Sequence, residues 1–403
     1  MKICFFTENN YPGGMDKYIY TLINNWIGKE DVITLYCNKG HPGFDNLAAK
    51  VKAPHQVLPI EIITPTWEFI NSIRAKRIMP EFFLKIISFL LKYSQFPIYV
   101  IKLKRFFDKS NFKQLLIING GYPGGNCCRA ASIAWYLSKS KSSPMACLST
   151  LKRPAWYAAP FEYVIDKILK KTISKFIFVS KFVQSTLPER PQFLKNKATI
   201  IYPSINPLNS EASKSIPNTK NHTKTVTNFL MLGTYEEHKG HDLLFDSIVK
   251  ALNVSDKIHF NIAGHGTSIE KEHIVKGINS RKLSKHVRLM DFQPDPYSLY
   301  RDCDVVVIPS IAYDSISLVA VEAMSLRKPI ITTNIGGLEE LFNLNPNIGL
   351  MSKINPDHFS QCLIKIIENH EIRTTMGNNG YNLFRKYFTA EIFAQSYYKN
   401  VIE

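Results

Sequence analysis

Residues 229–244 read Phe-Leu-Met-Leu-Gly-Thr-Tyr-Glu-Glu-His-Lys-Gly-His-Asp-Leu-Leu. An apolar run of strand length is followed by a glycine turn that carries Lys239, and then by the start of an amphipathic helix. Such a turn exposes backbone N–H groups and the positive end of a helix dipole, and both favour a phosphate group. A lysine in the turn can neutralise that phosphate, although most lysines are simply solvated.

The same alternation of short apolar runs and helical patterns extends in both directions from this stretch. In the N-terminal half the expected strands are Ile3–Thr7, Val32–Cys37, Leu115–Asn119, Met145–Ser149, Phe176–Val179 and Thr199–Tyr202. In the C-terminal half they are Phe229–Leu232, Ile258–Ala263, Val287–Met290, Val305–Ile308, Ile330–Thr332 and Gly349–Met351. Strands that alternate with helices predict parallel sheets covered on both faces.

A polar segment, Pro207–Thr227, separates the two series of strands and is nearly free of large apolar residues. We therefore predict an α/β protein with two doubly wound, Rossmann-like domains that face a central cleft. Residues 1–206 form the predicted N-terminal domain, 207–227 the linker and 228–387 the C-terminal domain. Ligands bind beyond the carboxyl ends of the strands in such sheets, so the cleft is the expected ligand site.

The composition is basic, with 50 Lys and Arg against 33 Asp and Glu and a formal net charge of +17. This excess favours anionic partners: nucleic acid, an anionic membrane face or a phosphorylated substrate. The basic residues are dispersed and no recognition motif accompanies them, so we expect no nucleic-acid partner. The seven cysteines lack metal-site spacing, and Cys4, Cys147 and Cys303 lie in apolar runs. We therefore predict neither a disulfide framework nor a zinc site.

Residues 74–109 break the alternation, because apolar side chains cover most of the predicted helical surface and basic residues flank it. In one interpretation these helices pack on the N-terminal sheet and their lysines reach solvent. In the other they form a basic, apolar surface that docks on an anionic membrane. The N-terminus turns polar too early for a secretory signal, and no uncharged apolar stretch reaches the roughly 18 residues of a spanning helix. We expect a cytoplasmic protein, with any membrane contact peripheral on the inner face.

Three further turns of small residues follow predicted strands: Gly13-Gly14, the glycine-rich residues 119–126, and Gly264-His265-Gly266. Each of them alone is more often a tight turn than a ligand site. The chain has no Walker lysine motif, and no Gly-x-Gly-x-x-Gly sequence opens the first helix. Neither a P-loop ATPase nor an ordinary NAD enzyme is therefore expected.

The segment from Asp314 to Glu322 combines a loop carboxylate with a carboxylate inside the next helix. Asp314 can meet sugar hydroxyls, the N–H groups of residues 315–318 remain for phosphates, and Glu322 can reach a ribose diol. The alternative is that Asp314 caps the helix and Glu322 is an ordinary helical residue. Asp302 and Asp304 have the spacing of an Asp-x-Asp metal motif, but Asp304 begins an apolar strand. We interpret that pair as structural and predict no metal site.

In this order, the C-terminal motifs resemble those of the retaining glycosyltransferases of sequence family 4, the group 1 glycosyl transferases. The matching stretches are 229–244, 262–266, 287–292, 300–310, 314–324 and 335–340, whereas the N-terminal half matches weakly. The resemblance implies the two-domain GT-B fold and transfer of a sugar from a nucleotide diphosphate sugar, without metal or cofactor. The implied acceptor is a glycan or a lipid-linked molecule, and the expected pathway is bacterial surface polysaccharide synthesis, such as that of lipopolysaccharide.

The resemblance also implies roles for individual residues. Lys239 holds the donor diphosphate, Asp314 contacts the donor sugar and Glu322 binds the ribose hydroxyls, and these three are the catalytic candidates. The other donor-binding candidates are Gly13, Gly14, Gly233, Thr234, Gly264, His265, Gly266, Arg288, Leu289, Met290, Ser315, Ile316, Ser317 and Leu318. The acceptor-binding candidates are Gly121, Tyr122, Ser149 and Arg153. The last helix, within 388–403, is expected to cross back to the N-terminal domain.

Three features depart from the family pattern. Thr234 stands where the family usually has an arginine, Asp314 and Ser317 replace a glutamate and a glycine, and residues 147–150 lack a histidine. These departures leave open a non-catalytic, membrane-associated subunit that binds nucleotide or carbohydrate. A nucleotide-sugar epimerase or hydrolase of the same architecture is the other alternative, and it forms its product without an acceptor.

Overall fold

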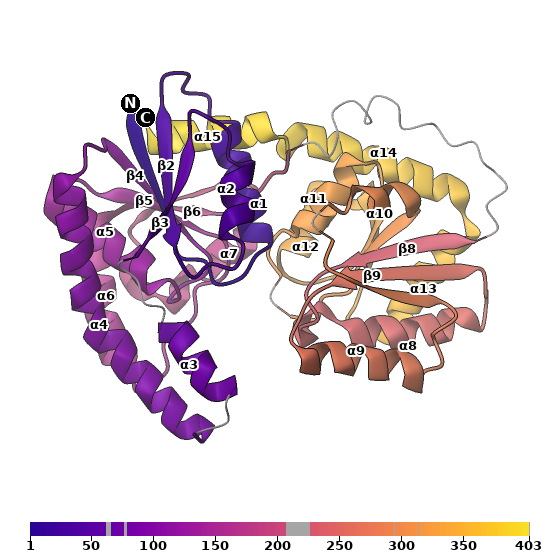
Figure 1. Ribbon diagram of the computed structural model, residues 1–403. Helices are drawn as coiled ribbons and strands as arrows, with labels where there is room; N and C mark the ends of the chain where they lie inside the picture. The colour runs from indigo at the N-terminus through magenta and orange to yellow at the C-terminus, as the bar shows by residue number, and fades with distance from the viewer. Residues whose placement is uncertain (62–65, 76–78, 207–225, 294, 313, 403) are drawn as a thin grey trace. The chain divides into compact units, whose positions relative to one another are not determined.

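The computed structural model describes residues 1–61, 66–75, 79–206, 226–293, 295–312 and 314–402. The chain divides into two compact units: an N-terminal unit of Met1–Tyr202 with Glu391–Glu403, and a C-terminal unit of Pro203–Ala390. Each unit is built on one parallel sheet with helices on both faces (Figure 1). The predicted α/β architecture of two doubly wound, Rossmann-like domains is confirmed.

The sheet of the N-terminal unit has the order β3-β2-β1-β4-β5-β6-β7. Successive strands move outward from β1 in one direction and from β4 in the other, which is the doubly wound pattern. The two central strands are therefore the most apolar, and Ile3–Phe6 and Leu115–Ile118 are buried. The strands are β1 (Lys2–Thr7), β2 (Val32–Asn38), β3 (Gln56–Ile60), β4 (Gln114–Asn119), β5 (Ser143–Cys147), β6 (Ile173–Phe178) and β7 (Lys197–Ile200).

The helices of the N-terminal unit include one that comes from the end of the chain. In that helix, α15 (Ala390–Val401), the ring of Phe393 contacts Tyr18 edge-on at 4.9 Å, and the hydroxyls of Tyr18 and Tyr397 form a hydrogen bond. The others are α1 (Gly14–Asn24), α2 (Phe44–Lys50), α3 (Thr66–Ala75), α4 (Glu81–Lys109), α5 (Asn126–Lys139), α6 (Ala159–Thr172) and α7 (Lys181–Ser185), with 3-10 turns η1 (Leu187–Glu189) and η2 (Pro191–Phe193).

The sheet of the C-terminal unit has the order β10-β9-β8-β11-β12-β13. Its strands are β8 (Thr227–Leu232), β9 (Ile258–Gly264), β10 (Val287–Asp291), β11 (Val305–Ile308), β12 (Ile330–Thr333) and β13 (Gly349–Ser352). Its helices are α8 (His241–Leu252), α9 (Ser268–Ser280), α10 (Tyr297–Asp302), α11 (Leu318–Ser325), α12 (Gly336–Leu344), α13 (Pro356–Glu368) and α14 (His370–Tyr387), with 3-10 turns η3 (Glu237–Lys239) and η4 (Pro346–Ile348).

Four N-terminal strands differ from the sequence prediction. β3 was not predicted, because it is an edge strand in which only Ile60 is buried and which contains Pro59. The strands β5, β6 and β7 begin earlier than predicted, at Ser143, Ile173 and Lys197. In β6 the polar residues Ser174 and Lys175 interrupt the apolar run after Ile173. Ser143 is small and Lys197 is exposed, so neither carries the apolar signal on which the prediction rested.

The predicted linker, 207–227, lies outside the described residues except for its last two positions. Thr227 is buried and begins β8, so including it in the linker was wrong. The N-terminal unit ends at Tyr202, whereas the prediction extended that domain to residue 206. Ser204, beyond that boundary, donates a hydrogen bond to the carbonyl of Phe388 in the same C-terminal unit.

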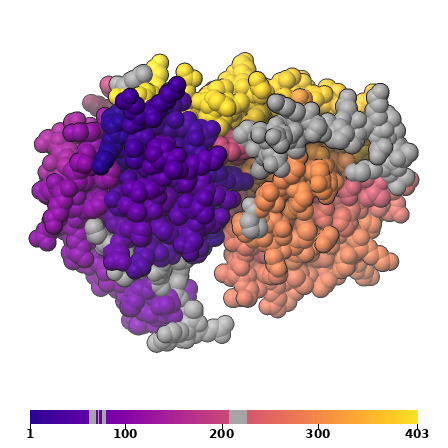
Figure 2. Space-filling model, turned by 45° about the horizontal axis from the view of Figure 1, so that its top comes forward, coloured from indigo at the N-terminus to yellow at the C-terminus, as the bar shows by residue number. Residues whose placement is uncertain are grey.

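The predicted helical segment 74–109 is mostly the single long helix α4. Its inner face, with Phe96, Tyr99, Leu103 and Phe107 buried, belongs to the core of the N-terminal unit. There Phe107 meets Trp135 of α5 edge-on at 5.3 Å. The interpretation as a helix packed on this unit is therefore confirmed for the inner face. The beginning of α4 and its neighbour α3 project as a lobe from the rest of the unit (Figures 1 and 2).

Candidate functional site

Most of the donor-site candidates in the C-terminal unit gather at the carboxyl edge of its sheet. β8 ends at Leu232 and β9 at Gly264, and the two following turns are joined by their backbones. The N–H of Tyr235 donates to the carbonyl of His265 at 2.9 Å. A Cβ atom on Gly264 would lie 1.8 Å from the Gly233 carbonyl oxygen, so only glycine permits this approach.

The loops after β8 and β11 meet at an ion pair. Lys239 Nζ lies 3.1 Å from Asp314 Oδ2, and Ser310 Oγ donates to the same oxygen at 2.7 Å. The side chains of Lys239 and Asp314 are 25% and 10% exposed. Gly240 has φ +76°, and a Cβ atom there would lie 1.9 Å from the Pro309 carbonyl oxygen. The structure therefore brings two of the three catalytic candidates together, and a glycine makes the approach of their loops possible.

Three helices beside this ion pair begin without a side-chain cap. They are α8, α11 and α12, which follow β8, β11 and β12, and their N-cap residues are Gly240, Ser317 and Ile335. In contrast, α9, α13 and α14 of the same unit are capped by Thr267, Asn355 and Asn369. The first N–H groups of a helix have no partner inside the helix, so an uncapped N-terminus favours an anion. This edge of the sheet is thus suited to a phosphate group.

The loop that carries Asp314, Ser315 and Ile316 is fixed against the start of α12. The N–H of Gly337 donates to the Asp314 carbonyl at 2.9 Å. A Cβ atom on Gly337 would lie 2.4 Å from the Ile316 nitrogen, so the two segments touch through their backbones. Ser317 and Leu318 then begin α11. The sequence motif at residues 335–340 gave no sign of this packing, which positions the candidate donor loop.

Glu322 lies inside α11 and is 3% exposed. Its Oε2 accepts a hydrogen bond of 2.6 Å from the hydroxyl of Tyr300 in α10, which is fully buried. Burial, followed by the charge of Glu322, raises the pKa of the Tyr300 phenol well above its usual value. A buried carboxylate needs such a partner. Sequence reasoning missed Tyr300, because a tyrosine in an adjacent element carries no local signal of the contact.

The candidates for a nucleobase pocket are only partly brought together. The hydroxyl of Tyr235 donates to the carbonyl of Met290 at 2.8 Å, and His265 meets Phe292 edge-on at 5.3 Å. Leu289 and Met290 are half-buried near the carboxyl end of β10. Arg288 is exposed, and the residue opposite it on β9 is Asn261, which lies farther from the carboxyl end of the sheet. Its predicted place at the site is not supported, because the strand register leaves Arg288 below the carboxyl edge.

Two other positions clarify the charge around the site. Thr234, which replaces the family arginine, donates to Glu236 at 2.6 Å and brings no positive charge. Asp304 accepts a hydrogen bond of 2.8 Å from the Asn228 N–H near the amino ends of β8 and β11, and Asp302 pairs with Arg301. Asp304 is therefore structural, as interpreted from the sequence. Within the described ranges, no group of three or more His, Cys, Asp or Glu side chains could hold a metal ion.

Gly13 and Gly14 lie in the N-terminal unit, at the start of α1. The carboxylate of Asp16 already occupies this helix end: one oxygen accepts the Gly13 N–H at 3.2 Å, and the other lies 2.7 Å from Asn9 Nδ2 and 2.9 Å from His41 Nε2. Asp16 is 4% exposed. The start of α1 therefore differs from those of α8, α11 and α12, because a buried carboxylate disfavours a second anion there.

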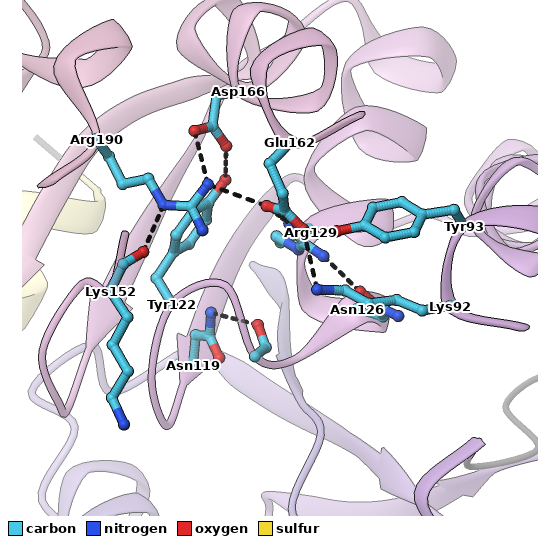
Figure 3. A network of polar contacts seen from close by, with 11 residues as sticks. Lys92, Tyr93, Asn119, Tyr122, Asn126, Arg129, Lys152, Glu162, Asp166 and Arg190 are labelled. Atoms are coloured by element: carbon cyan, nitrogen blue, oxygen red, sulfur yellow. Dashed lines mark hydrogen bonds and ion pairs between the residues drawn. The ribbon is translucent and has the colours of Figure 1, made fainter. Parts of the chain in front are cut away.

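The acceptor candidates adjoin a buried cluster of charges in the N-terminal unit, shown in Figure 3. At its centre, Glu162 of α6 accepts from Arg129 Nη1 at 2.8 Å and from Arg190 Nη1 at 3.0 Å. Arg190 also reaches Asp166 at 3.1 Å and donates to the Lys152 carbonyl at 2.9 Å. We call the residues Lys92, Tyr93, Tyr122, Arg129, Glu162, Asp166 and Arg190 the buried charge cluster.

The cluster keeps Glu162 ionised although it is buried. Burial opposes ionisation, but the charges of Arg129 and Lys92 outweigh it and lower the pKa of Glu162 to about 2. Burial has the larger effect on Asp166, whose pKa is raised in spite of Arg190. The positive charges within the cluster are thus required to stabilise the ionised carboxylate of Glu162 inside the unit.

The four acceptor candidates do not share one environment. Tyr122 is 1% exposed and its hydroxyl donates to Asp166, so its side chain is used inside the core. Gly121 lies against Ser149, since a Cβ atom on the glycine would be 3.5 Å from the serine Cβ. The Arg153 side chain is 78% exposed and pairs with Glu189 at 3.0 Å. The loops after β4 and β5 therefore meet. The buried charge cluster contacts both loops, because Tyr122 belongs to the first and Arg190 donates to the Lys152 carbonyl in the second.

Comparison with known proteins supports the C-terminal motif. Residues 213–383 match the family model of glycosyl transferases group 1. An uncharacterized glycosyltransferase of Methanocaldococcus jannaschii is 32% identical over 216 residues, which are 53% of this chain and 55% of that protein. The O-antigen biosynthesis glycosyltransferase WclY of Escherichia coli is 29% identical over 155 residues, 36% of this chain and 43% of that protein. The chain thus spans about half the length of these curated relatives.

Solved structures resemble the whole chain. Anabaena HepE, solved in complex with UDP, has a TM-score of 0.70 at 16% identity and is matched over 99% of both chains. A glycosyltransferase from Rickettsia africae has a TM-score of 0.71 at 15% identity, over 99% of this chain and 97% of that one. Likeness at this identity shows the fold alone, and the predicted GT-B fold class is confirmed.

Proposed function

We propose that this chain, whose residues 213–383 match the family model of glycosyl transferases group 1, moves a sugar from a nucleoside diphosphate sugar to a glycan or lipid-linked acceptor. One observation carries the proposal: the Lys239–Asp314 pair lies where α8 and α11 begin without side-chain caps. A leaving diphosphate gains negative charge as the sugar departs. Amide dipoles and an ammonium group aimed at that charge lower the barrier, because they need no reorganisation during the reaction.

The three catalytic candidates take separate roles in this proposal. Lys239 binds the diphosphate and stabilises its growing charge, together with the N-termini of α8 and α11. Asp314, fixed by Ser310 and Gly337, faces the hydroxyls of the donor sugar. Glu322, oriented by Tyr300, accepts the hydroxyls of the ribose. The site needs no metal in this account, because helix N-termini and a cation supply the positive charge.

We propose further that the anomeric configuration is retained, by attack on the face from which the diphosphate leaves. The bond between the anomeric carbon and the phosphate oxygen breaks, and the acceptor oxygen bonds to that carbon. The acceptor proton passes to the departing phosphate oxygen, which is the nearest developing base. Likeness to an O-antigen biosynthesis enzyme supports a place in bacterial surface polysaccharide synthesis, in the cytoplasm or on the inner face of the membrane.

The first experiment identifies the donor. Thermal unfolding is measured with UDP-, GDP-, ADP- and CMP-sugars, and a ligand at 100 times its dissociation constant should stabilise the protein by about 2.7 kcal/mol. The effective donor should then lose affinity for Glu322→Ala and keep it for the control Glu339→Ala, an exposed glutamate in α12. Equal binding by both variants would show that the ribose is held elsewhere.

The second experiment tests the reaction with the donor that binds. Product is followed with and without a panel of glycan and lipid-linked acceptors. Glycosylated product that depends on an acceptor supports the transferase. A free sugar or an epimerised donor formed without acceptor would favour the hydrolase or epimerase. Donor binding without turnover under any of these conditions would favour the non-catalytic subunit.

A further inference from the structure

The outer face of α4 carries a stripe of exposed apolar side chains. Phe82 is 69% exposed, Leu90 57% and Ile101 52%, and they recur at helical spacing. Phe83, Ile86 and Ile98 widen the same stripe and are also exposed. Surface apolar residues are normally scattered singly, so a continuous stripe indicates an interaction surface.

A second apolar stripe, on α6 and the loop before it, adjoins the first. Trp156 is 86% exposed, and Val164 on the next turns of α6 is 56% exposed. The ring of Phe89 joins the two helices, because it contacts Tyr157 at 5.6 Å and Phe161 at 5.5 Å. We define the α4–α6 face as the exposed residues Phe82, Phe83, Ile86, Leu90, Trp156, Tyr157, Phe161, Val164 and Ile168.

The exposed charges of α6, which adjoins this face, are all positive. Lys167, Lys170 and Lys171 are exposed on α6 and take part in no ion pair within the described part of the chain. The two carboxylates of the same helix, Glu162 and Asp166, are turned inward into the buried charge cluster (Figure 3). The outer surface of α6 is therefore purely cationic and apolar. Burial of its acidic residues leaves the lysines uncompensated.

We propose that the α4–α6 face docks on the surface of an anionic lipid bilayer. Aromatic rings such as those of Trp156 and Tyr157 are suited to the boundary between headgroups and acyl chains. Lysines beside them are attracted to anionic headgroups. A second copy of the chain fits less well, because a two-fold contact would bring the same three lysines near their equivalents.

The helix lies on the bilayer and does not cross it. By length and composition, α4 is the one helix in the described ranges that could span a membrane. However, Tyr99, Leu103 and Phe107 on its inner face are buried in the core, and Lys92 pairs with Glu162 at 2.9 Å. Crossing would remove these residues from the unit that they stabilise. Docking through the outer face leaves every one of these contacts in place.

This surface makes a lipid-linked acceptor the simplest choice for the proposed transferase. The loop at residues 149–153 contains two acceptor candidates and leads directly to Trp156. Docking itself requires no glycosyl transfer, so its test is independent of the proposed function. Failure of one proposal leaves the other unaffected.

Vesicle flotation of the full chain, without donor, tests the proposal. The protein should float with phosphatidylcholine vesicles that contain phosphatidylglycerol, and should remain unbound with phosphatidylcholine alone. Binding should fall when the salt is raised to about 1 M, because the Debye length shrinks to about 3 Å. Equal binding to neutral and anionic vesicles, or none to either, would overturn the proposal.

Two sets of variants locate the surface. Replacement of Lys167, Lys170 and Lys171 by glutamate should weaken binding by roughly a hundredfold or more, since each lysine near the membrane contributes roughly fivefold. Trp156→Ala should weaken it by roughly tenfold through lost apolar burial. The matched controls are Lys285→Glu and Ile269→Ser, both exposed in the C-terminal unit, and they should bind as the wild type does.

Each variant should keep the far-ultraviolet circular dichroism and melting temperature of the wild type, because the substituted side chains are exposed. Unchanged flotation in the lysine and tryptophan variants would reject the α4–α6 face. Sedimentation at several protein concentrations examines the competing occupant. A dimer that Trp156→Ala abolishes, together with absence of flotation, would assign the face to a second copy of the chain.

Discussion

The candidate donor site and the buried charge cluster both pair opposite charges, but they differ in burial and in the number of partners. At the donor site a single lysine meets a single aspartate, and Lys239 keeps 25% of its side chain exposed. In the cluster, Glu162 is 1% exposed and contacts three cations, Lys92, Arg129 and Arg190. The comparison teaches that a charge with several buried partners holds the structure, whereas a partly exposed charge beside uncapped helices remains available to a ligand.

The largest expected effect comes from breaking the cluster. Glu162→Gln leaves Arg129 and Arg190 buried without their shared carboxylate, and should lower the free energy of unfolding by about 3–5 kcal/mol. Urea unfolding at neutral pH measures the loss. The control Glu189→Gln removes the partner of exposed Arg153 and should cost under about 1 kcal/mol. Equal losses in the two variants would show that burial does not distinguish these pairs.

The pH dependence sharpens the same prediction. The pKa of Glu162 is lowered to about 2 in the folded protein, against an ordinary value of 4.5 for a glutamate. The stability that this depressed pKa provides is fully present above about pH 4.5 and is lost as the pH falls toward 2. The difference between wild type and Glu162→Gln should therefore be constant from pH 7 to pH 5 and shrink only below that range.

The second largest effect concerns the donor site. Lys239→Ala should reduce kcat/KM by about 100- to 1,000-fold, because it removes a charge aimed at the leaving diphosphate. Its free energy of unfolding should change little, since the lysine is partly exposed. The control Lys250→Ala, in α8 and paired with exposed Asp357, should leave both quantities as in the wild type. A Lys239→Ala variant with a much lower free energy of unfolding and an unchanged kcat/KM would show that Lys239 stabilises the structure and does not bind the donor.

The two regions also differ in how far the sequence predicts them. Lys239, Asp314 and the glycines near them occur in contiguous strand–turn–helix patterns, so their chemistry and place at the sheet edge could be predicted. The cluster joins residues 92, 129, 162 and 190, which lie in separate elements, and no local pattern connects them. For the same reason the sequence did not predict that Tyr300 bonds to Glu322, or that Asp16 accepts a hydrogen bond from the Gly13 N–H. Edge strand β3 was missed because it buries too little apolar surface.

A third prediction concerns a buried histidine beside the donor site. His241, the first residue of α8, is 3% exposed, and neither ring nitrogen has a hydrogen-bond partner among the described residues. Burial lowers the pKa of His241 to about 4, against an ordinary value of 6.5 for a histidine. Its protonation therefore favours the unfolded chain, so stability falls as the pH drops from about 6.5 toward 4.

This effect can be isolated by difference. Between pH 7 and pH 5 the wild type should lose about 2 kcal/mol of unfolding free energy relative to His241→Leu. The control Leu244→Ala replaces a buried residue of the same helix that does not titrate, and should leave the pH profile as steep as in the wild type. If the unfolding free energies of His241→Leu and the wild type change alike across this range, the His241 ring is hydrated or hydrogen-bonded in solution. The polar groups beside the donor site would then be satisfied, as they are in the buried charge cluster.

The smallest effect should come from Ser310, which is fully buried and donates to Asp314. Ser310→Ala removes one of the two contacts at Asp314 Oδ2 while Lys239 remains, so the donor KM should rise roughly fivefold, equivalent to about 1 kcal/mol. Ser247→Ala is the matched control, because that serine is equally buried in α8 and donates to the Leu243 carbonyl. Both variants lose one buried hydrogen bond, so their stabilities should fall alike. Only Ser310→Ala should alter the donor KM, since the lost bond orients a carboxylate that faces the sugar. A KM that responds equally to both would mean that Asp314 is held for packing, as Asp166 is held in the cluster.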